Sequence, residues 1–297
     1  MHRCTRSITA VLAAVVLSAC GGQENDQASD DASEGAGGSE ASYGECEVSG
    51  ERGSFELEPA TEDVLTVQTS LPSPAWWRGD SPETVDGGFE YCMAANIAHR
   101  AGLSSVKVDN VSFDALVAGQ TDDFDLALAQ ITITDERKKA ADFSEPYFGS
   151  DVGVLVKKDS GITADNIQDK VLGAAAGTTA VTLIEEEIQP TKAPKTFSDT
   201  DSMVQAVASG QVDAAIQDTA IMLGFAKGSG GVLEVVGQYT TGEEYGAIYP
   251  KGSSQAATIN EIIEQMKTDG TTDRLGEQWL AEAFGEDPAK VPSFSAS

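Results

Sequence analysis

From residue 64 onward, short apolar runs alternate with amphipathic stretches along most of the chain. The apolar runs predict strands over residues 65–69, 106–109, 126–130, 152–156, 171–175, 212–216, 232–236 and 246–249. Residues 126–129 are apolar without interruption, which is typical of a strand covered on both faces. Helical spacing of apolar residues predicts helices over residues 89–101, 113–117, 200–208 and 259–267. Strands that alternate with helices indicate an α/β fold built on mostly parallel sheets.

The charge balance excludes several classes of partner and site. The 297 residues include 48 Asp and Glu but only 19 Lys and Arg, for a formal net charge of -29. Nucleic acid is not expected as a partner, because few cations are present to neutralise phosphates. The histidines are His2 and His99, and so few histidines make a histidine metal site or a Ser-His-Asp triad unexpected. We therefore expect neither a metal nor another cofactor.

The first residues predict export and a lipid anchor. Arg3 and Arg6 precede the apolar run 8–17, which is too short to span a bilayer and is typical of a secretory leader. The run ends in Leu-Ser-Ala-Cys, and small residues before Cys20 resemble the lipobox of bacterial lipoproteins. This resemblance implies a signal peptide over residues 1–19 and a lipid that anchors the mature chain to the outer face of the cell membrane. An ordinary cleaved leader with a chance cysteine is the alternative.

Two segments of the exported chain follow from its composition. Residues 20–61 are expected to form an acidic, Gly/Ser-rich tether, because so few apolar side chains cannot offset the entropy of ordering. If Cys20 carries lipid and Cys4 leaves with the leader, Cys46 and Cys92 remain. Two thiols in an exported chain suggest one disulfide, and two free thiols are the alternative.

Several segments, taken in order, resemble one protein family. The most specific is residues 124–147, with Asp-Leu-Ala-Leu-Ala-Gln-Ile-Thr-Ile-Thr-Asp-Glu-Arg followed by Asp-Phe-Ser-Glu-Pro-Tyr. The supporting segments are Leu-Thr-Val (65–67), Pro-Ala-Trp-Trp (74–77), Gly-Gly-Phe-Glu (87–90), Val-Ser-Phe-Asp-Ala-Leu (111–116), Gly-Thr-Thr (177–179), residues 210–218 and Asp-Gly-Thr-Thr-Asp-Arg-Leu (269–275). Together they resemble the extracellular solute-binding proteins of polar amino-acid ABC importers, family 3, over residues 62–285.

This resemblance implies two α/β lobes joined by two extended crossover strands, the periplasmic-binding-protein-like type II fold. Residues 62–151 and 247–297 would form lobe one with the C-terminal tail, and residues 152–246 would form lobe two. The crossovers, near residues 151–154 and 244–247, would act as a hinge. A free amino acid would be clamped between the lobes, and the permease subunits of an ABC transporter would recognise the closed protein. A monomer is expected.

A free amino acid is a zwitterion, so a site that grips its main chain needs a cation and an anion, both hydrogen-bonded when the cleft closes. Arg137 is the candidate cation. It lies past the carboxyl end of the strand predicted over residues 126–130, where α/β sheets place their ligands, and its planar fork suits a carboxylate. Asp218 follows the strand over residues 212–216, and the resemblance implies that it binds the ammonium group. A helix cap is the alternative role for Asp218.

The resemblance also implies further contacts with the ligand's main chain. Thr132 would add a hydroxyl and a backbone N–H to the carboxylate. Thr178 and Thr179 open a predicted helix, whose free N–H groups attract a carboxylate from the second lobe.

The remaining candidates concern the ligand's side chain. Phe113 and Trp76 are expected to form an apolar wall, with Trp77 as the alternative to Trp76 and core packing as the alternative for each. Two departures from the family pattern favour an uncharged amino acid. Residues 70–73 carry no carboxylate, and Gln130 replaces a common glycine, where its side chain would crowd or hydrogen-bond the ligand.

Two other classes of function remain as alternatives. An enzyme on the same scaffold, such as a periplasmic dehydratase or a lyase, would need a general acid or base in the cleft. No further carboxylate stands out there, and His99 lies in the middle of a predicted helix. A sensory ligand-binding module would need a transmembrane or kinase segment, and none follows Ser297. We therefore expect a binding protein rather than an enzyme.

Overall fold

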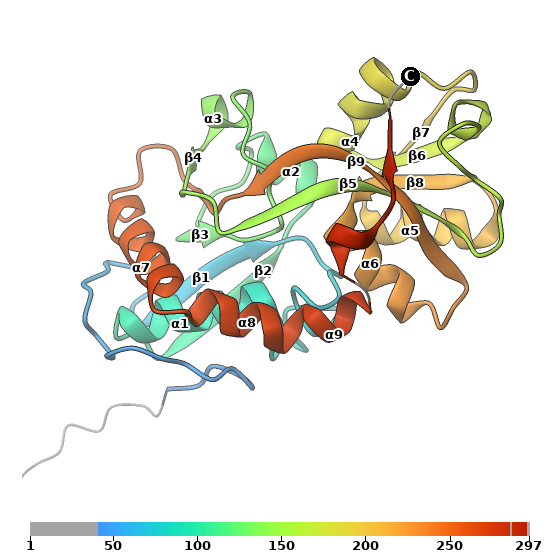
Figure 1. Cartoon of the computed structure of the whole chain (residues 1–297). Coiled ribbons are helices and arrows are strands. Elements are labelled where there is room, and N and C mark those ends of the chain that lie inside the picture. The colour runs from blue at the N-terminus through green and yellow to red at the C-terminus, as the bar shows by residue number, and fades with distance from the viewer. Residues whose placement is uncertain (1–40, 286, 296–297) are drawn as a thin grey trace, which may run out of the picture. The chain divides into compact units, whose positions relative to one another are not determined.

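The computed structural model describes residues 41–285 and 287–295. The predicted signal peptide, the lipidated Cys20 and the first half of the predicted tether lie outside these residues. Within them, the chain forms two β-sheets with helices packed on both, so the predicted α/β class is confirmed (Figure 1). No helix in the described ranges is long and apolar enough to cross a membrane.

The first sheet has the strand order β2-β1-β3-β10-β4. Its strands are β1 (Val64–Thr69), β2 (Ser105–Asn110), β3 (Leu126–Ala127), β4 (Asp142–Phe143) and β10 (Ile248–Tyr249). β1, β2 and β3 are parallel, whereas β10 pairs antiparallel with β3 and β4. The associated helices are α1 (Phe89–Arg100), α2 (Phe113–Val117), α3 (Arg137–Ala140), α7 (Ala256–Thr268), α8 (Thr271–Trp279) and α9 (Ala281–Phe284). The chain thus leaves this sheet after β4 and returns to it at β10.

The second sheet has the strand order β11-β9-β5-β8-β6-β7. Its strands are β5 (Phe148–Lys157), β6 (Leu172–Ala175), β7 (Lys195–Phe197), β8 (Ala214–Asp218), β9 (Leu233–Tyr245) and β11 (Ser293–Phe294). The helical segments are η1 (Ile167–Asp169), α4 (Thr179–Thr182) continued by the π-helical turn η2 (Leu183–Ile188), α5 (Thr200–Ser209), α6 (Thr219–Gly228) and η3 (Pro288–Lys290). β6, β7 and β8 are parallel, and β5 runs antiparallel to both β8 and β9.

β5 and β9 are the long paired strands of the second sheet, and they start and end where the chain leaves and rejoins the first sheet (Figure 1). Their pairing is irregular between Ser150 and Val152, where one residue of β5 faces residues 240–242 of β9. The Asp151 carboxylate closes this irregularity by accepting the backbone N–H groups of Thr241 (2.9 Å) and Gly242 (3.1 Å). The two strands lie where the crossovers were expected, and the lobe boundaries stay a prediction.

The four predicted helices form close to their expected bounds, and α1 illustrates why. Phe89, Met93 and Ile97 recur every four residues, so they lie on one face of the helix, and each is at most 1% exposed in the core against the first sheet. Gly102, at φ 78, follows the helix and takes the left-handed conformation that glycine adopts without strain. The periodicity therefore specifies the packing of α1 on this core.

β4 and β11 were not predicted, and three other strands differ from the prediction for identifiable reasons. The strand expected over residues 126–130 is regular only at Leu126–Ala127, because the backbone turns at Gln130, whose φ is 50. The strand expected over residues 232–236 continues to Tyr245, since pairing with β5 rather than an apolar pattern holds its polar half. β7 was not predicted, because Lys195 and Thr196 are exposed and give it no apolar pattern.

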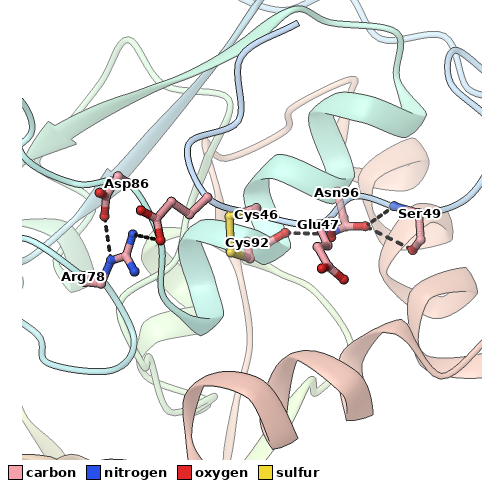
Figure 2. The surroundings of a disulfide bond; sticks show 8 residues. Cys46, Glu47, Ser49, Arg78, Asp86, Cys92 and Asn96 are labelled. Carbon is pink, nitrogen blue, oxygen red and sulfur yellow. Dashed lines mark hydrogen bonds and ion pairs between the residues drawn. A yellow bond between two sulfur atoms is a disulfide. The ribbon is translucent and has the colours of Figure 1, made fainter.

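The described part of the predicted tether packs against the first sheet and α1. The predicted Cys46–Cys92 disulfide is confirmed, with Cα atoms 5.3 Å apart (Figure 2). One turn along α1, the Asn96 side chain accepts the Ser49 N–H at 2.9 Å and donates to the Glu47 carbonyl at 3.4 Å (Figure 2). We call the first sheet with its packed helices the first half of the molecule, and the second sheet with its helices the second half. The ordered contacts of the first half therefore begin before residue 62.

The C-terminal segment reaches from the first sheet to the second. Phe284 of α9 belongs to the core that includes α1, whereas Phe294 of β11 packs edge-on against Tyr239 with ring centroids 6.0 Å apart. Gly237 makes this contact possible, since a Cβ there would lie 2.0 Å from the Phe294 ring. Gln238 adds hydrogen bonds to the carbonyls of Pro288 (3.0 Å) and Val291 (3.2 Å). β11 thus covers the outer edge of β9.

Loss of the disulfide should lower the free energy of unfolding of the exported domain by about 2–4 kcal/mol, mainly because the unfolded chain gains freedom. Urea unfolding of the Cys46→Ser/Cys92→Ser variant checks this. Dithiothreitol is the control, because it should destabilise the wild type but leave the variant unchanged. Equal stability of wild type and variant would contradict the expectation.

Candidate functional site

A cleft is lined by residues from both sheets at the carboxyl ends of parallel strands, where α/β folds place their ligands. The first half contributes the loop 70–73 after β1, Phe113 of α2 and Gln130 beyond β3, and the second contributes Asp218 at the end of β8. The cleft is narrow in this structure, with about 40 Å³ of space open to the centres of water-sized molecules. A neighbouring groove is lined by Arg137, Thr179 and Glu243. Thr178 lines both the cleft and the groove, which together we call the two hollows.

Arg137 lies at the start of α3 and spans the two halves. Its side chain is largely buried, with the residue 8% exposed. Nη1 donates to the Thr132 carbonyl at 2.6 Å and Nη2 to the Gly177 carbonyl at 2.8 Å, and the guanidinium lies 5.4 Å from the Phe113 ring centroid. Burial lowers the pKa of Arg137, and the negative charges of Asp218 and Glu243 oppose this shift. The cation is thus held in place by oxygen atoms from both halves.

The turn around Gly177 brings the second half close to α2. Gly177 has a φ of 77, and a Cβ there would lie 2.8 Å from the Cα of Asp114, so only glycine fits. Thr178 follows, with its hydroxyl donating to the Ala175 carbonyl at 2.8 Å, and Thr179 begins α4. The Gly177 carbonyl and the hydroxyls of Thr178 and Thr179 therefore lie at the junction of the two halves.

Glu243 of β9 is a site residue that the sequence analysis missed. Its Oε2 atom accepts the Thr132 hydroxyl at 2.5 Å and the Thr179 hydroxyl at 2.9 Å. These hydroxyls come from opposite halves, so one carboxylate joins them. A carboxylate beside the predicted crossover 244–247 is the sequence signal that could have identified it.

Asp218 ends β8 and precedes α6, and it is 4% exposed. Its Oδ1 atom has no hydrogen-bond partner within the described part of the chain. Burial raises the pKa of Asp218 well above its usual range, the nearby Glu243 carboxylate raises it further, and Arg137 partly offsets both. A buried carboxylate oxygen that faces a cleft without a donor is suited to a cationic group of a ligand.

Gln130 is fixed by a buried carboxylate behind the cleft. Glu90, which is fully buried near the start of α1, accepts the Gln130 N–H at 2.8 Å and also its side-chain amide. The same carboxylate accepts the Trp77 indole N–H at 2.8 Å and the Tyr147 hydroxyl at 2.5 Å. Gln130 in turn accepts the Ser73 hydroxyl at 2.7 Å, so its side chain is tied to the loop 70–73. The left-handed backbone here explains why glycine suits this position.

The aromatic candidates lie in different places. Phe113 is half-buried and lines the cleft, as expected of a wall residue. Trp76 is fully buried among Phe89, Phe148 and Tyr245, with ring centroids 4.9–5.6 Å away, and does not line the cleft. Trp77 is buried in the same core and is held by Glu90. A ligand contact for Trp76 stays a prediction.

The geometry brings together most of the predicted site residues, and their role in binding stays a prediction. Those at the two hollows are Phe113, Gln130, Arg137, Thr178, Thr179 and Asp218, with Thr132 hydrogen-bonded to two of the lining residues. Among the described residues, no three His, Cys, Asp or Glu side chains lie together as a metal site requires.

Comparison with known sequences identifies related proteins. A model of the bacterial extracellular solute-binding proteins, family 3, matches residues 66–282. The L-cystine-binding protein TcyJ of Escherichia coli (strain K12) is 31% identical over 222 residues, which are 73% of this chain and 80% of TcyJ. The ABC transporter glutamine-binding protein GlnH of Bacillus subtilis (strain 168) is 37% identical over 175 residues, 58% of this chain and 62% of GlnH.

Solved structures share the fold. An ancestral arginine-binding protein bound to arginine matches with a TM-score of 0.66 and 32% identity, covering 74% of this chain and 99% of that protein. The ancestral amino-acid-binding protein AncCDT-1, described as a precursor of cyclohexadienyl dehydratase, matches with a TM-score of 0.64 and 30% identity, covering 73% and 95%. The predicted type II periplasmic-binding-protein fold is thereby confirmed.

Because burial raises the pKa of Asp218, Asp218→Asn should be more stable than the wild type near about pH 7, before any ligand is added. A carboxyl whose pKa is higher in the folded chain than in the unfolded chain binds its proton more tightly when folded. Its ionisation therefore destabilises the fold as pH rises from about 3.9, the unfolded value, through the raised native pKa. Below about pH 3.9 both states are protonated, and the advantage of the variant should disappear.

Thermal unfolding across this pH range checks the expectation. Asp165→Asn, at an exposed position in the second half, is the matched control and should change stability little at any pH. A stability difference between Asp218→Asn and wild type that did not depend on pH would contradict the assignment.

Proposed function

This chain belongs to the bacterial extracellular solute-binding proteins, family 3, and from that membership we propose that its cleft binds a free amino acid for delivery to an ABC importer. The observation that carries the proposal is the proximity of two opposite charges at adjoining hollows: Asp218 of one half lines the cleft, and Arg137 of the other half lines the groove beside it and lies close enough to affect the pKa of Asp218. A zwitterion needs opposite charges at opposite ends, and these two groups supply them. The family relationship favours binding over catalysis.

The two charges divide the main chain of the ligand between them. Arg137 would hold the α-carboxylate through its planar fork, together with the hydroxyls of Thr132 and Thr179. Asp218 would accept the α-ammonium group on its Oδ1 atom, which has no other donor among the described residues. Because Asp218 is buried and costly to ionise alone, a ligand cation would stabilise its charged form. Both ends are needed, so the site selects α-amino acids.

The ligand's side chain would occupy the cleft toward the loop 70–73. This loop carries no carboxylate, and Phe113 offers an aromatic face. Asp199 and Asp201 of the second half also line the cleft, but their carboxylates already accept hydrogen bonds from Ser202 and Gln205. We therefore propose an uncharged amino acid. The names of the cystine- and glutamine-binding relatives are consistent with this choice, whereas the ancestral arginine-binding protein holds a charged amino acid.

Delivery would follow from closure of the two lobes, 62–151 with 247–297 and 152–246. An amino acid on the first lobe gains Asp218, Thr178 and Thr179 only when the second lobe approaches, so it binds the closed state more tightly. A permease would then recognise the closed monomer. We further propose that lipid on Cys20 holds the protein at the outer face of the membrane. An enzyme on this scaffold remains the alternative, and consumption of the bound amino acid would reveal it.

A thermal-shift screen of the soluble domain against the twenty amino acids and L-cystine tests the function. An uncharged amino acid should raise the melting temperature by mass action, since binding at about 100 times Kd adds about 2.7 kcal/mol to the free energy of unfolding. A melting temperature that responds to none of these compounds would contradict the proposed function.

Arg137→Ala should weaken binding of the amino acid found in that screen by roughly 100-fold or more, because a buried partner of its carboxylate is lost. Calorimetry measures the affinity, and circular dichroism checks that the variant is folded. Lys138→Ala is the matched control, since Lys138 is an exposed cation on the same helix and lines neither hollow. Unchanged affinity in Arg137→Ala would contradict the assignment.

A further inference from the structure

One carboxylate of the chain already accepts hydrogen bonds from two hydroxyls that the proposed function assigns to the ligand. Glu243 Oε2 lies 2.5 Å from the Thr132 hydroxyl and 2.9 Å from the Thr179 hydroxyl. A hydroxyl has a single proton to donate, so neither threonine can donate to Glu243 and to a second carboxylate at the same time. Glu243 and the α-carboxylate of an amino acid therefore have overlapping partners.

The surrounding charges place Glu243 within the site rather than beside it. Its negative charge acts on both Arg137 and Asp218, the two groups proposed to grip the zwitterion. Both outer nitrogens of Arg137 are bonded to main-chain carbonyls, those of Thr132 and Gly177. The guanidinium keeps further N–H groups that can bind an external carboxylate, whereas each of the two hydroxyls must give up Glu243 before it can do so.

We propose that Glu243 is an internal competitor that lowers the affinity of the site by holding the Thr132 and Thr179 hydroxyls until the α-carboxylate of an amino acid displaces it. This inference rests on the proposed function. It adds an affinity-determining residue on β9, the strand that rejoins the first sheet. At the two hydroxyls the chemistry is an exchange of one carboxylate acceptor for another.

Glu243 has somewhere to go when it is displaced. The residue is half-buried and lines the open groove of about 910 Å³ beside the cleft. Lys139 lines the same groove and offers a cation, and water can solvate the released carboxylate there. Moving toward this groove also takes a negative charge away from Asp218, which favours ionised Asp218 as it receives the ammonium group.

The competition has a simple quantitative form. An amino acid binds only to molecules whose hydroxyls are free, so the apparent Kd is the intrinsic Kd divided by the fraction of molecules in that state. Two hydrogen bonds to a charged acceptor make the free state the minor one. If about one molecule in ten has released Glu243, removal of its carboxylate should tighten binding roughly tenfold.

The adjacent residue provides a matched control. Glu244 carries the same charge on the same strand, but it is exposed, and its side chain lines different grooves. Replacement of Glu244 changes the net charge of this acidic protein as much as replacement of Glu243 does. Any effect of charge on long-range attraction should therefore be common to both variants, whereas competition is specific to Glu243.

Calorimetry with L-cystine and L-glutamine as probes decides between these outcomes. We expect Glu243→Ala to bind whichever probe the wild type binds roughly tenfold more tightly, Glu243→Gln to lie between the two, and Glu244→Ala to match the wild type. Unchanged or weaker binding by Glu243→Ala, with the wild type binding normally, would overturn the competition but leave the proposed function standing. A wild type that binds neither these probes nor any other amino acid would overturn the proposed function and the competition together.

A second measurement needs no amino acid. Since Glu243 joins a hydroxyl of each half, Glu243→Ala should open the cleft of the free protein, and small-angle scattering should report a larger radius of gyration than for wild type or Glu244→Ala. Equal radii for all three proteins would show that the bridge does not hold the halves together and would overturn the competition. The radius also detects a variant that fails to fold, in which case Glu243→Gln, which keeps the size of the side chain, replaces it.

Discussion

A guanidinium group that is removed from water must have oxygen atoms around it, because an uncompensated buried cation is strongly destabilising. Arg137 meets this condition only when both halves of the molecule contribute, one through the Thr132 carbonyl and the other through the Gly177 carbonyl. The approach of the halves satisfies this requirement, and Asp218 and Glu243 add negative charge near the cation. The cation is therefore a structural bridge, and it is also the group proposed to bind the carboxylate of the ligand. Its partners are exchangeable oxygen atoms rather than a dedicated salt bridge, which leaves it available to a carboxylate.

The precision of the site depends on a second buried charge. Glu90 lies behind the cleft and receives donors from Trp77, Gln130 and Tyr147, which come from three separate segments of the chain. Burial raises the pKa of Glu90, and these hydrogen bonds act in the opposite direction. Gln130, which has a left-handed φ and lines the cleft, is thus held by the Glu90 carboxylate, which does not line the cleft. Such support fixes the geometry of a site more firmly than the loop alone could.

Elements that local patterns encode were predictable from the sequence, whereas elements that depend on distant pairing were not. The spacing of Phe89, Met93 and Ile97 predicted α1, because a helix repeats within a few residues of sequence. The polar half of β9 and the short β7 carry no such pattern, since backbone pairing with neighbouring strands holds them. Arg137 and Asp218 were singled out by their places after apolar strands together with the family resemblance. Glu243 was not, because its significance depends on two threonines more than sixty residues away, Thr132 and Thr179.

The C-terminal strand makes the paired strands unequally stiff along their length. Where Ser293 and Phe294 pair with Gln238 and Tyr239, three strands lie together, β5, β9 and β11, and each added strand resists bending. A few residues further along, the regular pairing stops at Asp151, and Gly242 opposite has a φ of 63. Bending should concentrate at this weak point, which becomes the fulcrum for any rotation between the halves. Asp151, through its two bonds to Thr241 and Gly242, then governs how freely the molecule flexes without contacting anything held in the cleft.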